Sequence, residues 1–387
     1  MIQSVVLCNH WYKPFRKRRI PRETPCNRQC CTSVCTTVCS IQSTYLELRM
    51  DLAIALDIGH SAVKGRAARL DAPGDRVSIN FPTCVDEAIA ISDDATRVQA
   101  DRETVEVAGK KYFFGATAMK QGSSRSFVGQ NKDWVFTAAH DVLLLGGVKT
   151  ILAKFDEAPA RIVLVLGLPA ENFNAHKDEL QKRALELVSS YLGAATTSVR
   201  VKIQPQPYGA LQNIIFLPTG EVNTRTDVDK QTWGVIEIGH YTTDYLLSEE
   251  GDMVQRAFGS SEGVSAVYNR LEHVLADKKL NTSLKSIHQA VTTGVVRNYG
   301  QEVDVSKEVQ SIVEPFARKL IDDAKRRFGQ SLSDMHGIFI AGGGAEVPAV
   351  YDLIHAEFPH AIKTGEPQYS VAEGFTRLAL FVANNQA

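Results

Sequence analysis

Asp57-Ile58-Gly59-His60-Ser61-Ala62-Val63-Lys64 is the stretch of sequence from which the fold is first inferred. It ends an apolar run that begins at Leu52, and a second strand pattern follows from residue 63 to residue 70. This pattern predicts a β-hairpin whose turn carries a carboxylate, a glycine, a hydroxyl and a lysine. Backbone N–H groups in such a turn can bind phosphate oxygens, Lys64 adds a positive charge, and Asp57 can hold Mg²⁺ through water. Alone, the same composition also fits a plain turn without a ligand.

A second copy of the pattern occurs in residues 234–244, where Glu237 takes the position of the acid and Gly239 follows two residues later. Two such hairpins can clamp one polyphosphate from opposite sides. His60 and His240 fit either phosphate contacts or exposed turn residues without a role. The residues expected to bind phosphate in the two turns are Gly59, His60, Ser61, Lys64, Gly239, His240, Tyr241, Thr242 and Thr243.

A third element is the apolar run at residues 338–341, which leads into Gly342, Gly343, Gly344 and then Glu346. A buried strand that ends in three glycines allows the backbone to approach a flat ring or a ribose closely, because no side chain intervenes. The sequence therefore predicts that these four residues bind a nucleotide. Three such elements in this order indicate a nucleotide-binding site much more strongly than any one of them does.

The order of the remaining elements predicts an α/β fold. Helical spacing occurs at residues 134–145, 176–192, 264–275, 309–328, 347–358 and 370–382, and strand patterns occur at residues 161–168 and 199–204. A polar stretch at residues 218–232 separates two rounds of strand, turn and strand. Two similar α/β lobes that face a cleft are the simplest architecture.

Composition limits the classes of function. With 44% hydrophobic and 22% charged residues, the chain is neither a disordered nor a membrane-spanning type. The chain has 43 Lys and Arg residues, of which 8 lie in residues 1–49, and 44 Asp and Glu residues, of which 2 lie there. Residues 50–387 therefore hold 35 basic and 42 acidic residues. Because DNA phosphates require clustered basic residues, the acidic remainder is not expected to bind nucleic acid directly.

Residues 1–49 differ from the rest of the chain. They contain six of the seven cysteines, next to a basic run at residues 16–19. The cysteine spacing lacks the paired C-x2-C of zinc ribbons, and no secretion signal is evident. We expect residues 1–49 to be a non-native or disordered extension that results from a misplaced start before Met50. A basic tail and a metal-binding extension are the alternatives.

These motifs resemble those of the actin, sugar-kinase and heat-shock ATPase superfamily, and most closely the plasmid-segregation actins called ParM or StbA. Further segments that resemble this family are residues 165–169, 204–210, 259–265 and 368–374. The resemblance implies an actin-like fold with two ribonuclease H-like lobes around a nucleotide cleft. Lobe I would be residues 50–215, lobe II residues 216–369, and the helix at residues 370–387 would return to lobe I.

The resemblance also implies a function. It implies a cytoplasmic ATPase that uses ATP and Mg²⁺, forms filaments of its own copies and segregates plasmid DNA. A DNA-binding adaptor of ParR type would link the filament to centromere DNA, and no membrane contact is expected. Asp57 and Glu237 would hold Mg²⁺ through water, Gln206 would act with them in catalysis, and Ser261, Glu262 and Gly263 would bind the nucleotide.

Two departures from the family pattern concern this site. Glu237 occupies a position where most relatives have Asp, and His240 and Tyr241 lie in a turn that is usually rich in glycine. Gln206 stands where the closest segregation actins have a catalytic Glu, and an amide can orient water but is a poor proton acceptor. We therefore expect Gln206 to position the attacking water.

Other functions remain possible at this point. An actin-fold kinase of small molecules would need a carboxylate base in the cleft, and a nucleotide-gated binding protein would need no filament. A chaperone would need a further peptide-binding domain, and a cell-shape actin would carry an amphipathic membrane segment. The choice between ATP and GTP, the filament geometry and the identity of the adaptor are open.

Overall fold

The computed structural model describes residues 50–122, 134–196 and 198–385. All of these belong to the unit Met50–Ala387. The expectation of a non-native extension at residues 1–49 lies outside the described residues.

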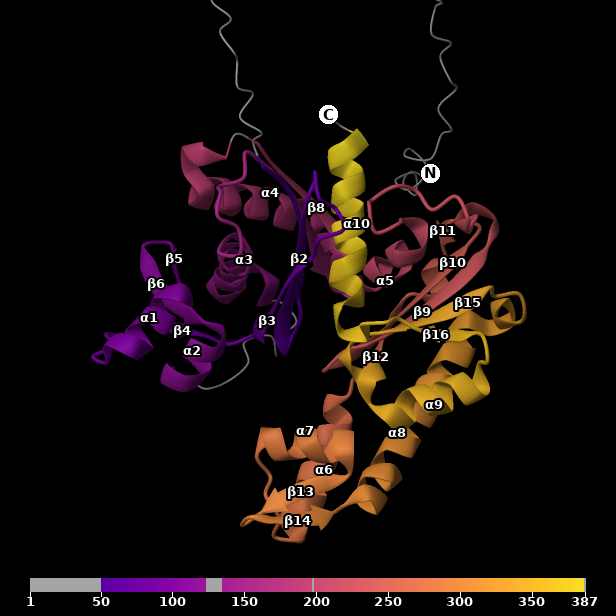
Figure 1. Cartoon of the computed structure of the whole chain (residues 1–387). Helices are drawn as coiled ribbons and strands as arrows, with labels where there is room; N and C mark the ends of the chain where they lie inside the picture. Colours follow the sequence, from indigo (N-terminus) through magenta and orange to yellow (C-terminus); the bar gives the residue numbers. More distant parts are fainter. Residues whose placement is uncertain (1–49, 123–133, 197, 386–387) are drawn as a thin grey trace, which may run out of the picture. The chain divides into compact units, whose positions relative to one another are not determined.

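The first sheet has the strand order β3-β2-β1-β7-β8 (Figure 1). β1 pairs antiparallel with β2 and parallel with β7, and β7 pairs parallel with β8. The strand bounds are β1 Asp51–Ile58, β2 Ala62–Arg69, β3 Val77–Pro82, β7 Arg161–Leu168 and β8 Ser198–Pro205. The predicted hairpin at residues 52–70 thus lies in the middle of this sheet.

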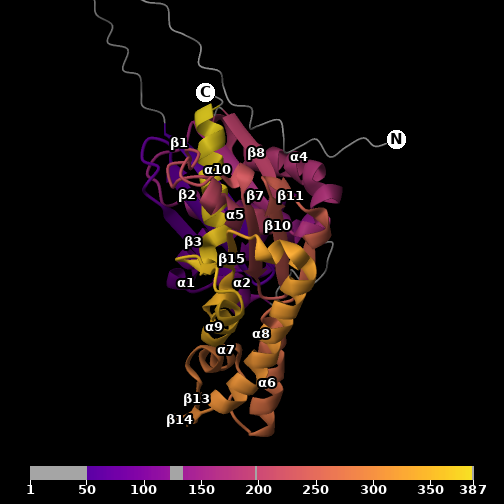
Figure 2. The same ribbon diagram turned by 90° about the vertical axis from the view of Figure 1, so that its right-hand side faces the viewer.

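Alternate residues of β1 face two different helix layers, because successive side chains of a strand point to opposite faces. Leu52, Ile54 and Leu56 pack in one core with α3 (Ala138–Leu152) and α4 (Phe173–Leu192). Ala53 and Ala55 lie in another core with α5 (Gln206–Ile215) and α10 (Ser370–Asn385). Both figures show α10 beside α5 (Figures 1 and 2).

The second sheet has the order β11-β10-β9-β15-β16, and β12 pairs with β10. Ile236 and Ile238 of β9 pack against α6 (Ser265–Asp277), α8 (Ser306–Phe328) and α9 (Pro348–Glu357), whereas Val235 joins the core that contains α5 and α10. That core is therefore shared by the two sheets. The strand bounds are β9 Thr232–Ile238, β10 Thr242–Glu249, β11 Asp252–Met253, β12 Gly259–Glu262, β15 Gly337–Ala341 and β16 Ala361–Lys363.

Smaller elements are inserted in each half of the unit. The first half contains a three-stranded sheet with the order β4-β6-β5 and two helices. The second half contains α7 and a two-stranded hairpin. Their bounds are β4 Val85–Glu87, α1 Asp94–Arg102, β5 Thr104–Val107, β6 Lys110–Phe114, α2 Gly115–Gln121, α7 Leu284–Thr293, β13 Val295–Asn298 and β14 Gln301–Asp304.

One predicted helix begins later than expected. Residues 134–145 were predicted to be helical throughout, but Trp134–Phe136 form the 3-10 turn η2, and α3 begins at Ala138. The Thr137 hydroxyl accepts a hydrogen bond from the backbone N–H of His140, which satisfies one of the free amides at the start of α3. The start of the helix is therefore set by this cap.

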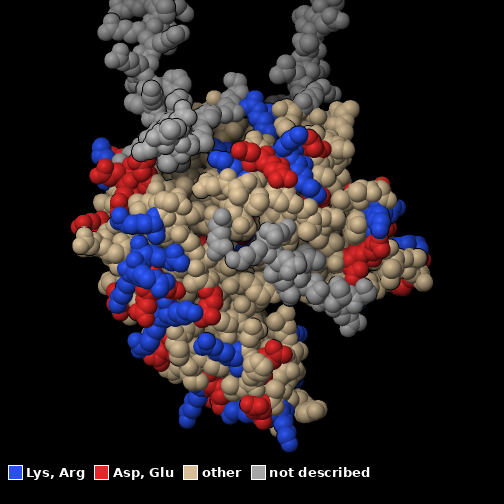
Figure 3. Space-filling view, turned by 180° about the vertical axis from the view of Figure 1, so that it is seen from behind, with Lys and Arg blue, Asp and Glu red and all other residues tan. Residues whose placement is uncertain are grey.

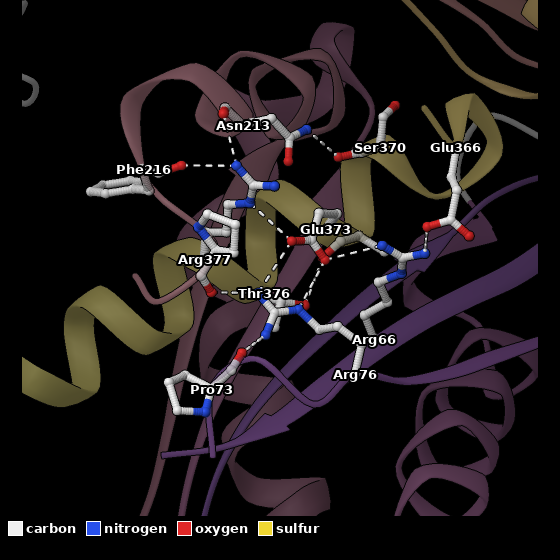
Figure 4. Close-up of polar contacts among 12 residues, drawn as sticks. Arg66, Pro73, Arg76, Asn213, Phe216, Glu366, Ser370, Glu373, Thr376 and Arg377 are labelled. Atoms are coloured by element: carbon white, nitrogen blue, oxygen red, sulfur yellow. Dashed lines mark hydrogen bonds and ion pairs between the residues drawn. The ribbon is translucent and has the colours of Figure 1, made fainter. Parts of the chain in front are cut away.

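A cluster of ionic side chains ties α10 to β2 (Figure 4). Glu373 of α10 accepts hydrogen bonds from Arg76 Nε (3.0 Å), Arg377 Nε (2.9 Å) and Arg66 Nη1 (3.1 Å). Glu366 forms a further ion pair with Arg66. Burial by itself would raise the pKa of Glu373, but the hydrogen bonds and charges of Arg76 and Arg377 outweigh burial and lower the pKa. Charged contacts therefore add to the apolar contacts of α10.

Candidate nucleotide site

A pocket that is open to solvent lies between the turn that joins β1 to β2 and the turn that joins β9 to β10. The first hairpin contributes Asp57, Gly59, His60, Ser61, Ala62 and Lys64, the second contributes Glu237, Gly239, His240, Tyr241 and Thr242, and α5 contributes Gln206. The structure thus brings together the two turns that the sequence repeats, although they belong to different sheets.

The first turn is closed by a backbone hydrogen bond from Gly59 N to Ala62 O (3.1 Å). Thr83, which follows β3, supports this turn: its hydroxyl donates to Gly59 O (2.6 Å) and its N–H donates to Ser61 O (3.1 Å). Thr83 is fully buried. The turn is therefore fixed by a neighbouring segment as well as by its own hydrogen bonds.

The second turn repeats this geometry, with a hydrogen bond from Gly239 N to Thr242 O (2.8 Å). Gly263, just after β12, donates its N–H to Tyr241 O (2.8 Å). A Cβ atom on Gly263 would lie 2.5 Å from His240 O, which is too close for any side chain. Gly263 therefore lets the chain after β12 lie directly against the second turn.

The ionisable groups of the pocket are buried or partly buried, and each shifts the pKa of another. Lys64 lies opposite Asp57 across the first hairpin, with 3.1 Å between Nζ and Oδ2. Burial alone would lower the pKa of Lys64, but Asp57 and Glu237 outweigh burial and raise it. Burial raises the pKa of Glu237 to about 8; Lys64 opposes this rise, whereas Asp244 and Asp57 add to it. Lys64 is therefore charged, and Glu237 holds a proton near neutral pH.

A divalent cation beside Asp57 would favour loss of the Glu237 proton, so these two carboxyl groups fit such an ion. Within residues 50–122, 134–196 and 198–385, no three His, Cys, Asp or Glu side chains are grouped closely enough to hold a metal directly. Mg²⁺ usually keeps several waters and takes one or two carboxylates together with substrate phosphates. Asp57 and Glu237 fit an ion held in this way, through water. A bound Mg²⁺ would neutralise phosphate charge at this position.

Gln206 is the first residue of α5, directly after β8. Its side-chain Nε2 donates a hydrogen bond to Asp57 Oδ1 (2.7 Å). Gly167 of β7 makes room for it, because a Cβ atom at Gly167 would lie 2.9 Å from Gln206 Cγ. The amide is therefore held at the pocket wall beside Asp57, where it can orient a water molecule but not accept a proton strongly.

The glycine triplet has a different position from the two turns. Gly342 has a φ of +82°, and a Cβ atom there would lie 2.4 Å from Ile238 O. A Cβ atom on Gly344 would lie 2.3 Å from Ile238 Cγ2. The triplet thus packs on the end of β9, next to Glu237. Gly342, Gly343, Gly344 and the exposed Glu346 are not among the residues that line the pocket.

Four other residues expected at the nucleotide also lie outside the pocket lining. Ser261 and Glu262 are on β12, which pairs with β10, and Gly263 follows them. The Thr243 hydroxyl donates to Glu262 O (3.0 Å), and the Glu262 carboxylate forms an ion pair with Lys319 (3.0 Å). In this structure, these residues support the second hairpin.

Two polar residues next to the pocket carry no assignment from the sequence. Thr83 supports the first turn from 24 residues away, and nothing in its own neighbourhood indicates this. Asp244 lies opposite Glu237 across the second hairpin. The repeat could have revealed Asp244, because a four-residue turn closed between Gly239 and Thr242 fixes the register of the strands.

Two models of actin-like families match this chain. Residues 55–209 match the model described as actin like proteins, N terminal domain, and residues 235–349 match the model described as archaeal actin homologue MreB-like, C-terminal. The first match includes the first turn and Gln206, and the second includes the second turn and the glycine triplet. Among curated proteins, none matches this sequence significantly.

Solved structures share the fold at low identity. A pCBH ParM non-polymerisable quadruple mutant is 20% identical with a TM-score of 0.63, over 87% of this chain and 100% of its own. A 15-stranded ParM filament from Clostridium botulinum is 20% identical with a TM-score of 0.64, over 86% of this chain and 99% of its own. The archaeal actin homologue Ta0583 in complex with ADP is 15% identical with a TM-score of 0.59, over 87% of this chain and 100% of its own.

A fold with two sheets and two facing phosphate-type turns is that of the actin-like class, and the predicted actin-like α/β fold is confirmed. Models of two actin-like families thus match successive parts of the unit Met50–Ala387, which contains actin-like domains. The predicted resemblance to ParM proteins is confirmed for the fold. Of the helices in the described residues, none has the length and apolar character needed to cross a membrane.

Proposed function

We propose that this chain is a cytoplasmic, filament-forming ATPase that segregates plasmid DNA. The observation that carries the proposal is the pocket itself, in which two turns of one design face each other beside Lys64, Asp57 and Gln206. Two similar structures support it: a ParM protein was solved as a filament, and an archaeal actin homologue was solved with ADP.

The residues of the pocket have separate roles in this proposal. Backbone N–H groups of the two turns and the ammonium group of Lys64 bind the phosphates of ATP. Gln206, held by Asp57, orients the attacking water, and its effect is on the barrier more than on binding. Asp57 and Glu237 hold Mg²⁺ through water, which neutralises the charge of the phosphates and of the carboxylates together.

Binding of ATP in this pocket explains why filament assembly would depend on the nucleotide. ATP that contacts both turns joins the first sheet to the second and so favours one arrangement of the protomer. A single arrangement can repeat head to tail, and the result is a filament when the rotation between neighbouring copies does not close a ring. Hydrolysis removes the contacts to the γ-phosphate and should loosen the filament.

Plasmid DNA would be attached through an adaptor of ParR type. Residues 50–387 hold fewer Lys and Arg than Asp and Glu residues, 35 against 42. Basic side chains of α8 form ion pairs, such as Arg318 with Glu314 (2.7 Å) and Lys325 with Glu357 (2.5 Å). Figure 3 shows both charge types interspersed on one face. The chain alone should therefore not retard plasmid DNA in a gel at about 0.15 M salt.

High-speed pelleting tests the proposal. The protein at micromolar concentration should pellet with ATP or a non-hydrolysable analogue and should stay in the supernatant with ADP. Phosphate release measured in the same samples should follow assembly. Phosphate release without pelleting in either triphosphate would favour a non-filamentous nucleotide-gated protein. ATP consumption only in the presence of a small-molecule acceptor would favour a kinase.

A further inference from the structure

The two phosphate turns touch each other through aromatic rings. His60 of the first turn and Tyr241 of the second have ring centroids 5.7 Å apart and planes at 86°. This is the edge-to-face arrangement that aromatic pairs favour. Both residues line the pocket, so their contact joins the two turns directly at the site.

Buried rings support the contact from the side of the first sheet. Trp134 lies 5.8 Å from His60 between ring centroids, and His140 of α3 lies 5.1 Å from Trp134. Trp134 and His140 are both 3% exposed, and Trp134 Nε1 and His140 Nδ1 have no hydrogen-bond partner among the described residues. Burying such polar ring atoms without a hydrogen bond costs free energy. His60 is backed by these two buried rings.

Rings also support the contact from the side of the second sheet. His240 lies 4.6 Å from Tyr241, and Tyr268 of α6 lies 5.7 Å from His240. The Tyr268 hydroxyl and His288 Nδ1 of α7 are 2.8 Å apart, within hydrogen-bond distance. The row of rings therefore runs from α3 through both turns to α6 and α7.

We propose that the His60–Tyr241 contact is a bridge that fixes the separation of the two phosphate turns and thereby slows the release of a bound nucleoside triphosphate. The inference rests on the proposed function. The two turns belong to different sheets, so contacts across the pocket set the distance between the backbone N–H groups of one turn and those of the other. Glycine at position 241 would leave the amide in place but would provide no ring to span the pocket. His60 and Tyr241 are thus positioning residues.

A double-mutant cycle tests the bridge. The variants are His60→Ala, Tyr241→Ala, the double variant and Tyr241→Phe, which keeps the ring. Tyr299→Ala is the matched control, because Tyr299 is 99% exposed on the β13–β14 hairpin. The measurement is the dissociation rate of a fluorescent ATP analogue displaced by excess ATP. Thermal unfolding without nucleotide checks that each variant is folded.

Each alanine variant should release the analogue about 3- to 10-fold faster, as expected for the loss of one aromatic pair. The double variant should be no faster than the faster single variant, because both remove the same contact. Tyr241→Phe and Tyr299→Ala should stay within about twofold of the parent.

Three results would overturn the bridge while leaving the proposed function intact: effects that multiply in the double variant, an unchanged rate in Tyr241→Ala, or a rate in Tyr241→Phe as fast as in Tyr241→Ala. A parent protein that binds no ATP analogue would overturn the proposed function, and the inference with it.

Discussion

Replacing Gln206 with alanine should slow ATP hydrolysis far more than it weakens ATP binding. The variant removes the amide that donates to Asp57 at 2.7 Å but leaves the ion pair between Asp57 and Lys64 at 3.1 Å. Asp57 therefore keeps a charged partner, and the cost to folding should not exceed about 1.5–3 kcal/mol, the value of one hydrogen bond to a charged group. The two phosphate turns are untouched.

The expected effect on catalysis follows from the position of the amide. A group that orients the attacking water acts on the transition state, so its loss should slow hydrolysis by on the order of 10- to 1,000-fold, or about 1.4 to 4 kcal/mol of barrier. The affinity for ATP should stay within a few fold. Filaments should still form with ATP and should last longer.

Asp57→Asn is the matched comparison, because it keeps the shape of the side chain and removes its charge. Lys64 then loses its ion-pair partner, and one carboxylate that fits Mg²⁺ is lost. This variant should lose ATP affinity as well as turnover. The assays are phosphate release under single-turnover conditions and titration with a fluorescent ATP analogue.

Two outcomes would refute the assignment of Gln206. One is hydrolysis at the parental rate in Gln206→Ala. The other is a loss of ATP affinity as large as that of Asp57→Asn. Glu237 would then be the leading candidate for the catalytic group.

Three further predictions concern the free energy of unfolding, which can be measured by denaturant unfolding without nucleotide, and one of them also concerns ATP binding, which a titration with the fluorescent analogue checks. In the parent, the unfolded chain loses the proton of Glu237 near its ordinary pKa of 4.5 while the folded chain keeps it to about 8, so stability should fall as pH rises between these values. Glu237→Gln should remove this slope of the free energy of unfolding against pH, which is at most about 1.4 kcal/mol per pH unit. An equal slope in the parent and the variant would contradict the raised pKa of Glu237. Gly263→Ala should cost about 1–3 kcal/mol and weaken ATP binding, because its Cβ atom meets His240 O at 2.5 Å, whereas Gly74→Ala, with no atom within 4 Å, should be neutral. Tyr299→Asn should stabilise the fold by about 0.5–1 kcal/mol, because Tyr299 has a φ of +46° that asparagine adopts more easily; a loss of stability would show that the ring has a contact.

The sequence predicts those parts of the site that are local. The acid, the glycine and the polar turn recur within about ten residues, so both hairpins could be predicted, and the strand pattern at residues 199–204 placed Gln206 just after a strand. The contacts between distant segments could not be predicted in this way. Thr83 reaches the first turn from the end of β3, and Glu262 pairs with Lys319, which lies far along the chain.

The glycines illustrate the same limit. Their absence of side chains indicates that the backbone approaches something closely, but it does not identify the neighbour. For Gly263 the neighbour is the second turn, and for Gly342 and Gly344 it is the end of β9. In each case an added Cβ atom would meet protein, and the nucleotide contact indicated by the sequence pattern stays a prediction.

The position of α10 has a consequence for synthesis on the ribosome. β1 is made early, yet Ala53 and Ala55 are covered by α10, the last helix of the described chain. Until α10 leaves the exit tunnel, that face of the first sheet lacks its cover, and Arg66 and Arg76 lack Glu373. A nascent chain arrested before residue 370 would therefore present an uncovered apolar face, which is the kind of surface that chaperones bind.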